Sequence, residues 1–240
     1  MNRRLPLVLA LAPVCLSGLA LSFPAAAGSD ISGWYTGGDL GLNIGTSQNL
    51  SAGSNGVRND YGSGLIGGFR GGYAFANGLR PELEFEYRHS SMSSTKVQDS
   101  IGTSQPVGYN SGSLTAETLM GNLWYDFRQP EGTLSVIYPY VGAGIGLARV
   151  GINSENISTF QDTGGIANGS GTAFAYQLGF GANVEITSFL IASMDVRYLM
   201  TTNVSIPVQT TNSSFGDLKG EYHAPALFFG LSYKFGTDAS

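Results

Sequence analysis

Apolar and charged residues alternate through residues 79–88. The apolar residues of one parity are Leu79, Leu83, Phe85 and Tyr87. The charged residues of the other parity are Arg80, Glu82, Glu84, Glu86 and Arg88. Because successive side chains of a β-strand point to opposite faces, this pattern predicts a strand with one apolar face and one charged face.

The same alternation returns in seven further segments, so eight strands are predicted. Their expected bounds are 33–45, 64–76, 79–90, 114–127, 137–150, 172–185, 189–200 and 222–235. Short connections are expected near 76–78, 128–136 and 185–188, and long ones, rich in Ser, Asn, Gly and Thr, near 46–63, 91–113, 151–171 and 201–221. Asn77-Gly78 is a strong hairpin signal. No sustained helical periodicity follows residue 28. The predicted fold class is all-β: a transmembrane, eight-stranded, antiparallel up-and-down barrel.

Alternation alone also allows a soluble barrel, but three observations place the apolar face outward. That face carries too many large side chains for the inside of an eight-stranded barrel. The opposite face combines charges of both signs with glycine, which makes up 35 of 240 residues and is about twice as frequent as usual. Aromatic residues gather at the short-turn end, which predicts a girdle at a lipid–water boundary. The girdle residues are Trp34, Tyr73, Phe75, Tyr125, Phe127, Tyr233 and Phe235.

The charged face then lines the lumen. Its predicted members are Arg70, Arg80, Glu82, Glu84, Glu86, Arg88, Asp126, Glu185, Asp195, Arg197 and Lys234. An unpaired buried charge is costly, so we expect ion pairs among them. Two interpretations stay open at this point: a structural plug, which eight strands favour because they leave little open width, and a gated pore of low conductance.

The N-terminal segment has the pattern of a secretory signal peptide. Arg3 and Arg4 precede an apolar run that ends near Phe23 and is followed by Pro24-Ala-Ala-Ala27. We expect residues 1–27 to be removed and residues 28–240 to form one outer-membrane barrel domain. The single cysteine, Cys15, lies in the expected signal peptide, so no disulfide is predicted.

Charge and composition exclude several classes of function. Without Arg3 and Arg4 the chain has ten Lys and Arg residues and 17 Asp and Glu residues, which gives a formal charge of −7. This balance argues against nucleic acid, whose phosphates require basic patches. The two histidines, His89 and His223, have no ligand cluster near them in the sequence, and the mature chain has no cysteine, so no metal site and no cofactor are predicted.

Several motifs together resemble the eight-stranded OmpA-type β-barrel family of Gram-negative outer membranes. They are Gly33-Trp-Tyr-Thr-Gly-Gly, Pro81-Glu-Leu-Glu-Phe-Glu-Tyr, Asn122-Leu-Trp-Tyr-Asp-Phe127, Pro139-Tyr-Val-Gly-Ala-Gly-Ile-Gly146 and Gly230-Leu-Ser-Tyr-Lys-Phe235. The last motif resembles the signal read by the outer-membrane assembly machinery, with Gly230, Tyr233 and Phe235 in the matching positions. Residues 236–240 continue past the point where many members end, and no peptidoglycan-binding domain follows.

The resemblance implies a non-enzymatic outer-membrane protein with a role in envelope integrity, adhesion or antigenicity. Its implied partners are outer-membrane lipids and lipopolysaccharide, the assembly machinery, and a host or surface ligand that meets the loops. The first alternative is a small porin-like gated channel. A less favoured alternative is a lipid A-modifying enzyme, with Ser91 as nucleophile, His89 as base and Glu117 as orienting group. The Asn and Gly that such a His-x-Ser motif requires are absent, because Met92-Ser-Ser-Thr follows.

Overall fold

The computed structural model describes ten segments of the chain. They are residues 32–44, 47–52, 55–98, 104–107, 111–128, 136–155, 165–166, 168–206, 209–210 and 218–235. The expected signal peptide, Cys15 and residues 236–240 lie outside them. Within these segments no helix is long and apolar enough to cross a membrane.

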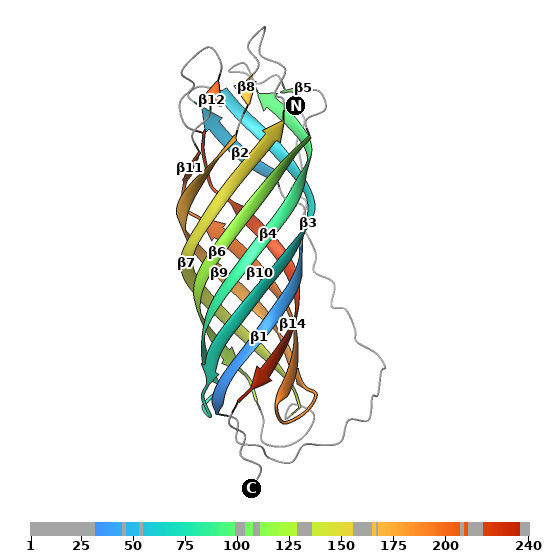
Figure 1. Cartoon of the computed structure of the whole chain (residues 1–240), viewed down its shortest axis with the longest axis vertical. Coiled ribbons are helices and arrows are strands. Elements are labelled where there is room, and N and C mark those ends of the chain that lie inside the picture. Colours follow the sequence, from blue (N-terminus) through green and yellow to red (C-terminus); the bar gives the residue numbers. More distant parts are fainter. Residues whose placement is uncertain are drawn as a thin grey trace, which may run out of the picture.

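Eight long antiparallel strands form a closed barrel (Figure 1). They are β1 (Gly33–Asn43), β3 (Asn55–Ala74), β4 (Leu79–Gln98), β6 (Ser111–Asp126), β7 (Ile137–Glu155), β9 (Asn168–Glu185), β10 (Leu190–Thr201) and β14 (His223–Lys234). Each pairs with the next long strand along the chain, and β1 pairs with β14 from Tyr35 and Lys234 to Asn43 and Ala226, which closes the barrel. The predicted fold class is confirmed.

The turns at one end are short, as expected. Between β3 and β4, Gly78 has a φ of 88°, a left-handed conformation that glycine adopts without strain. The backbone N–H of Leu79 donates to the side-chain oxygen of Asn77 across 3.1 Å, so the Asn-Gly pair shapes this turn. Residues 186–189 form the equally short connection between β9 and β10.

At the other end, the strands run further than the sequence predicted. Parts of the segments expected to be long loops belong to β3, β4, β6, β7 and β9 (Figure 1). Six short strands also lie at this end: β2 (Ser47–Ala52), β5 (Ser104–Val107), β8 (Gly165–Ile166), β11 (Val204–Ile206), β12 (Gln209–Thr210) and β13 (Leu218–Gly220). The prediction of four long loops there was therefore wrong in part. Their Ser-, Gly- and Asn-rich composition is typical of loops, but backbone pairing with neighbouring strands extends the barrel.

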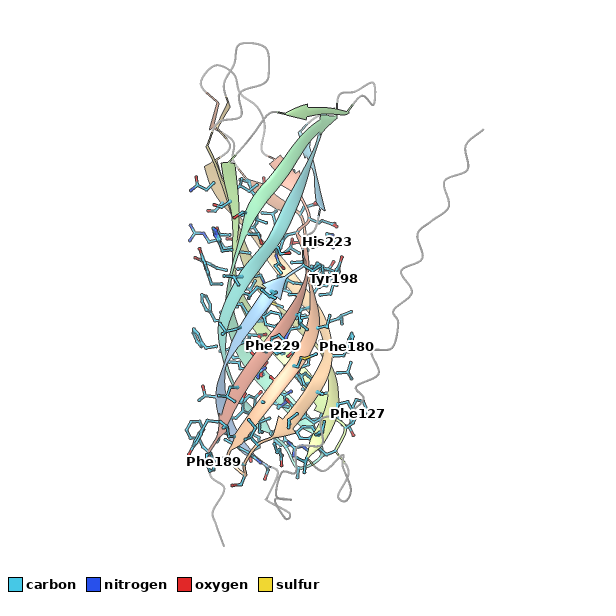
Figure 2. The ribbon with its side chains drawn as sticks, turned by 90° about the vertical axis from the view of Figure 1, so that its right-hand side faces the viewer. Phe127, Phe180, Phe189, Tyr198, His223 and Phe229 are labelled. Carbon is cyan, nitrogen blue, oxygen red and sulfur yellow. The ribbon has the colours of Figure 1, made fainter. Side chains whose placement is uncertain are left out.

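Over most of the barrel the apolar side chains point outward and the polar ones inward. On β9, Phe174, Leu178 and Phe180 are exposed, whereas Gln177 between them is buried. Figure 2 shows Phe180 and Phe229 on the outer surface near mid-height, with Phe127 and Phe189 near the short-turn end. Such a surface suits hydrocarbon, and closure satisfies every strand edge that hydrocarbon would leave unpaired.

Towards the loop end, this polarity reverses along the same strands. On β7 the outward residues change from Ile145 and Leu147 to Arg149, while the inward residues change from glycines to Val150 and Ile152. We call residues 119–126, 137–147 and 174–185 of β6, β7 and β9 the membrane section. Residues 112–118, 148–153 and 169–173 of the same strands form the loop-end section.

The loop-end section encloses an apolar cluster. Its members are Leu114, Ala116, Met120, Ala148, Val150, Ile152, Ala173, Ala175, Leu199, Val204, Ile206, Tyr222 and Ala224. We call this set the apolar plug. β11 contributes Val204 and Ile206, and it passes so close to β9 that a Cβ on Gly171 would lie 2.3 Å from the backbone oxygen of Ser205. Packed apolar side chains therefore occupy the lumen from the edge of the membrane section into the loop-end section.

Candidate functional site: the charged lumen

Arg197 of β10 occupies the centre of the lumen and is fully buried. Its guanidinium donates to Glu84, lies 3.3 Å from Glu86, and donates through Nε to Asp195 at 2.5 Å. Asp39 on β1 lies 4.0 Å away. One cation thus joins carboxylates from three strands that surround it, β1, β4 and β10, which holds opposite walls of the barrel together.

Two aromatic rings lie close to the same guanidinium. Its central carbon lies 4.4 Å from the ring centroid of Phe228 and 5.4 Å from that of Trp124. The indole N–H of Trp124 donates to Glu82 across 2.9 Å. Bulky inward side chains require small neighbours: a Cβ on Gly142 would lie 2.3 Å from the Trp124 ring. The inward glycines of β7 therefore make room for the contents of the lumen.

Two further arginines extend the ion pairs towards the short-turn end. Arg80 lies 3.3 Å from both Glu82 and Asp126. Arg70 lies 3.2 Å from Asp39 and 3.7 Å from Glu82, so Glu82 is shared between the two guanidiniums. The hydroxyl of Tyr35 donates to the same carboxylate across 2.7 Å.

Towards the loop end, Arg88 donates to Glu86 across 2.7 Å. The amides of Asn122 and Gln177 donate to Glu84 across 2.6 and 3.0 Å. We call the connected set the charged network: Asp39, Arg70, Arg80, Glu82, Glu84, Glu86, Arg88, Asp126, Asp195 and Arg197. Removing one partner from such a buried group leaves a charge without compensation, which is strongly destabilising.

The remaining predicted lumen residues, Glu185 and Lys234, lie at the short-turn end. Glu185 pairs with Arg128, which also contacts the hydroxyl of Tyr138, and Lys234 is buried. A cavity of about 20 Å³ lies beside Arg128 and Lys234, with room for about one water molecule. The sequence prediction omitted Asp39 and Arg128 from the ion pairs. The parity of Asp39 was a usable signal, whereas Arg128 follows the end of its strand, where parity gives no direction.

The predicted girdle residues are outward-facing and clustered. Trp34 and Tyr73 have ring centroids 5.2 Å apart, and the Tyr73–Phe75, Tyr125–Phe127 and Tyr233–Phe235 pairs lie 4.8, 4.9 and 5.1 Å apart. Phe189, which the prediction omitted, lies 5.5 Å from Tyr233. Of the expected assembly signal, Tyr233 and Phe235 point outward, whereas Gly230 faces Asp39 and Arg70 of the charged network.

The candidate catalytic trio shares the outward face, but its members have other neighbours. His89 lies opposite Thr115, and Ser91 lies opposite Ser113. Glu117 lies opposite Arg149 on the next strand, and their charged groups are 4.0 Å apart. The carboxylate is thus directed to an arginine rather than to His89, which the proposed catalytic relay would require.

The other histidine has contacts that the sequence did not predict. Nδ1 of His223 lies 3.3 Å from the Tyr198 hydroxyl, and Nε2 lies 3.2 Å from Glu221. Figure 2 shows Tyr198 and His223 together on the outer surface, above the apolar residues of the membrane section. In the part of the chain that the structure describes, no three His, Cys, Asp or Glu side chains gather as metal ligands would.

The outward apolar residues of the membrane section form an apolar belt around the barrel. A closed barrel with such a belt outside and ion pairs inside is an integral membrane β-barrel protein. Residues 14–235 match the sequence model of the outer membrane protein beta-barrel domain family, and the chain belongs to that family. The chain is also 25% identical over 242 residues to the outer membrane protein PagN of Salmonella typhimurium, with 96% of each chain covered. The predicted family and the predicted outer-membrane location are confirmed.

Two solved structures superpose on this chain. A major outer membrane protein from Thermus thermophilus superposes with a TM-score of 0.50 at 15% identity, covering 84% of this chain and 99% of that one. Ail, the attachment invasion locus protein of Yersinia pestis, was solved in complex with the heparin analogue sucrose octasulfate. It superposes with a TM-score of 0.41 at 10% identity, covering 85% and 99%.

Proposed function

We propose that this outer-membrane barrel is a non-enzymatic structural protein that carries its loop-end segments above the cell surface. The reversal of polarity between the two sections is the observation that carries the proposal. A wall that is polar outside and apolar inside suits water rather than hydrocarbon. The loop-end section therefore acts as a rigid stalk that raises the segments it connects beyond the bilayer.

The filled lumen supports a structural role for the barrel itself. The charged network crosses the membrane section, and the apolar plug follows it at the loop end. The ion pairs inside the membrane section and the close packing of the apolar plug at the loop end both oppose the passage of hydrated ions. The lumen residues thus hold the barrel together, and residues 45–54, 99–110, 156–167 and 207–217, which lie between the long strands and outside the apolar plug, supply the surface that meets a host or surface ligand.

Site-directed labelling tests the orientation that this function requires. Asn153 faces outward in the loop-end section, and Asn77 lies in the opposite turn between β3 and β4. Because the sole cysteine lies in the expected signal peptide, Asn153→Cys and Asn77→Cys each introduce one thiol. A membrane-impermeant maleimide should label the first in intact cells and the second only after the cells are broken. The reverse pattern would contradict the proposal.

Binding assays then separate presentation of a ligand-binding surface from a purely structural role. Variants in which short glycine–serine links replace residues 45–54, 99–110, 156–167 and 207–217 keep the long strands and the apolar plug, so they should fold but no longer bind host cells or matrix. Undiminished binding after removal of all four segments would exclude the adhesive role.

A gated channel is the second candidate, because an ion-pair network can rearrange across a lumen. Purified protein in a planar bilayer should show no steady open conductance if the lumen is a plug. Steady channels of reproducible size, abolished by heat unfolding, would favour the channel instead.

Wild-type protein that releases acyl chains from lipopolysaccharide, with Ser91→Ala inactive, would restore the enzyme hypothesis.

A further inference from the structure

A shallow hollow lies on the outer wall where the apolar belt ends. It is lined by Thr115, Glu117, Arg149, Gly151 and Ser170 of β6, β7 and β9. The strand register shows where the hollow lies relative to the apolar belt. The last apolar outward row consists of Leu119, Leu147 and Phe174, which are paired side by side across the three strands. The next outward row consists of Glu117, Arg149 and Thr172.

Arg149 is the one cation among the residues that line this hollow. Its side chain is 63% exposed, and the Glu117 carboxylate is 4.0 Å from it, beyond hydrogen-bond distance. The Ser170 hydroxyl oxygen lies 3.4 Å from Nε and Nη2. A guanidinium carries five N–H donors in a planar fork, so the two that are directed at Ser170 leave three without a hydrogen bond to the described residues.

Gly151 keeps the hollow open. A Cβ at this position would lie 3.0 Å from the Thr115 hydroxyl oxygen, and a larger side chain would occupy the space beside Arg149. The hydroxyl groups of Thr115 and Ser170 border that space on either side. The Thr115 hydroxyl donates to the Gly151 carbonyl across 3.5 Å. The hollow thus combines one cation, two hydroxyl groups and one flanking carboxylate, immediately above the hydrocarbon boundary.

The position of these charges on the wall is specific. Along the outward faces of β6, β7 and β9, as far as the structure describes their side chains, Glu117 and Arg149 are the first charged groups above the apolar belt. The outer leaflet of an outer membrane consists of glycolipid, whose phosphorylated sugars begin where its acyl chains end. Arginine is well suited to phosphate because its fork donates two parallel hydrogen bonds.

We propose that this hollow binds the phosphate group of an outer-leaflet glycolipid. Arg149 donates to the phosphate oxygens, the Ser170 hydroxyl donates to a phosphate or sugar oxygen, and the acyl chains lie along Leu119, Leu147 and Phe174. Glu117 repels the anion and so limits its affinity. The proposal rests on the proposed function in one respect, because it requires the loop end to face the outer leaflet.

The test measures binding of bisphosphorylated lipid A, and of the same lipid after phosphatase treatment, to the complete barrel in detergent. Wild type should prefer the phosphorylated lipid by about tenfold, the gain expected from one bidentate, charge-assisted contact. Arg149→Gln should remove that preference. Glu117→Gln should strengthen binding of the phosphorylated lipid several-fold, and Gly151→Val should weaken it while Arg149 is kept. Lys219→Gln, an exposed charge change on β13, is the matched control and should leave binding unchanged.

Several outcomes would overturn the proposal. Equal binding of both lipids by wild type would mean that the hollow does not recognise phosphate. A preference that survives Arg149→Gln would place the phosphate elsewhere. Competition by inorganic phosphate at the same concentration as the lipid would identify free phosphate, rather than a lipid headgroup, as the ligand. If the labelling of Asn153→Cys still places the loop end outside, each of these results removes the lipid site and leaves the proposed function intact.

Discussion

The membrane section and the loop-end section share the same strands but have opposite polarity. On β7 the membrane section turns Val141, Ile145 and Leu147 outward, whereas the loop-end section turns Val150 and Ile152 inward. Strand geometry is the same in both, because side chains alternate with period two throughout. The difference lies in the solvent that each section meets. Hydrocarbon favours apolar side chains outside, and water favours them inside.

The interiors of the two sections also obtain their stability differently. The charged network includes ion pairs that join separate strands, such as Arg197 with Asp39 and Glu84, so its members depend on one another. The apolar plug relies on close packing, in which each side chain contributes roughly in proportion to its buried area. A buried charge without its partner is costly, whereas a charge on the polar outer wall remains in contact with water. Removing one charged side chain should therefore lower the unfolding free energy more in the network than on the outer wall.

The largest effect is expected from the central arginine. Arg197→Ala leaves Glu84, Glu86 and Asp195 buried without their shared counter-charge, so we expect unfolding free energy to fall by about 3–5 kcal/mol. Arg149→Ala is the matched control, because it removes an arginine that is exposed and only loosely paired, and should cost at most about 1 kcal/mol. Urea titrations in detergent micelles, followed by tryptophan fluorescence and gel mobility, give both values. Equal losses in the two variants would mean that the network does not stabilise the lumen.

A charge placed at two outward positions of β9 tests the boundary between the sections. Leu178→Arg puts a guanidinium into the apolar belt and should cost on the order of 2–4 kcal/mol. Thr172→Arg makes the same addition six residues earlier on the same face, in the loop-end section, and should change stability by about 0.5 kcal/mol or less. The measurement is unfolding in phospholipid bilayers. If the two variants lose equal stability, the boundary between lipid and water does not lie between these residues.

Much of the barrel follows from sequence parity alone. The alternation at Glu82, Glu84 and Glu86 predicts both the strand and the direction of its charges, because period two is a local property of the backbone. The pairing of particular charges is not local. Arg197 and Glu84 are 113 positions apart and belong to strands that are not neighbours in the sheet, so their contact depends on barrel width and strand stagger.

The reversal of polarity in the loop-end section was not predicted, for a physical reason. The inward positions Ala148, Val150 and Ile152 continue the alternation, but their outward neighbours are Arg149, Gly151 and Asn153, a pattern that also fits a strand giving way to a loop. Recognising the reversal requires the knowledge that the strand leaves the hydrocarbon there. Short strands such as β11 also cannot be predicted from the local sequence, because the segments with which they pair lie elsewhere in the chain.

The smallest effect concerns glycines on the two faces of the wall. Gly146 points into the crowded lumen, where a Cβ would lie 2.0 Å from the Leu119 carbonyl oxygen and 2.8 Å from the Met120 Cα. Gly67 of β3 points outward, and a Cβ there would have no atom of the described chain within 4 Å. We expect Gly146→Ala to lower unfolding free energy by about 1–3 kcal/mol through overpacking. Gly67→Ala should be neutral or stabilising by about 0.4–1 kcal/mol, because alanine restricts the unfolded chain. Parallel urea midpoints for the two variants decide the matter: a Gly67→Ala loss as large as that of Gly146→Ala would show that an outward glycine is required by contacts outside this chain.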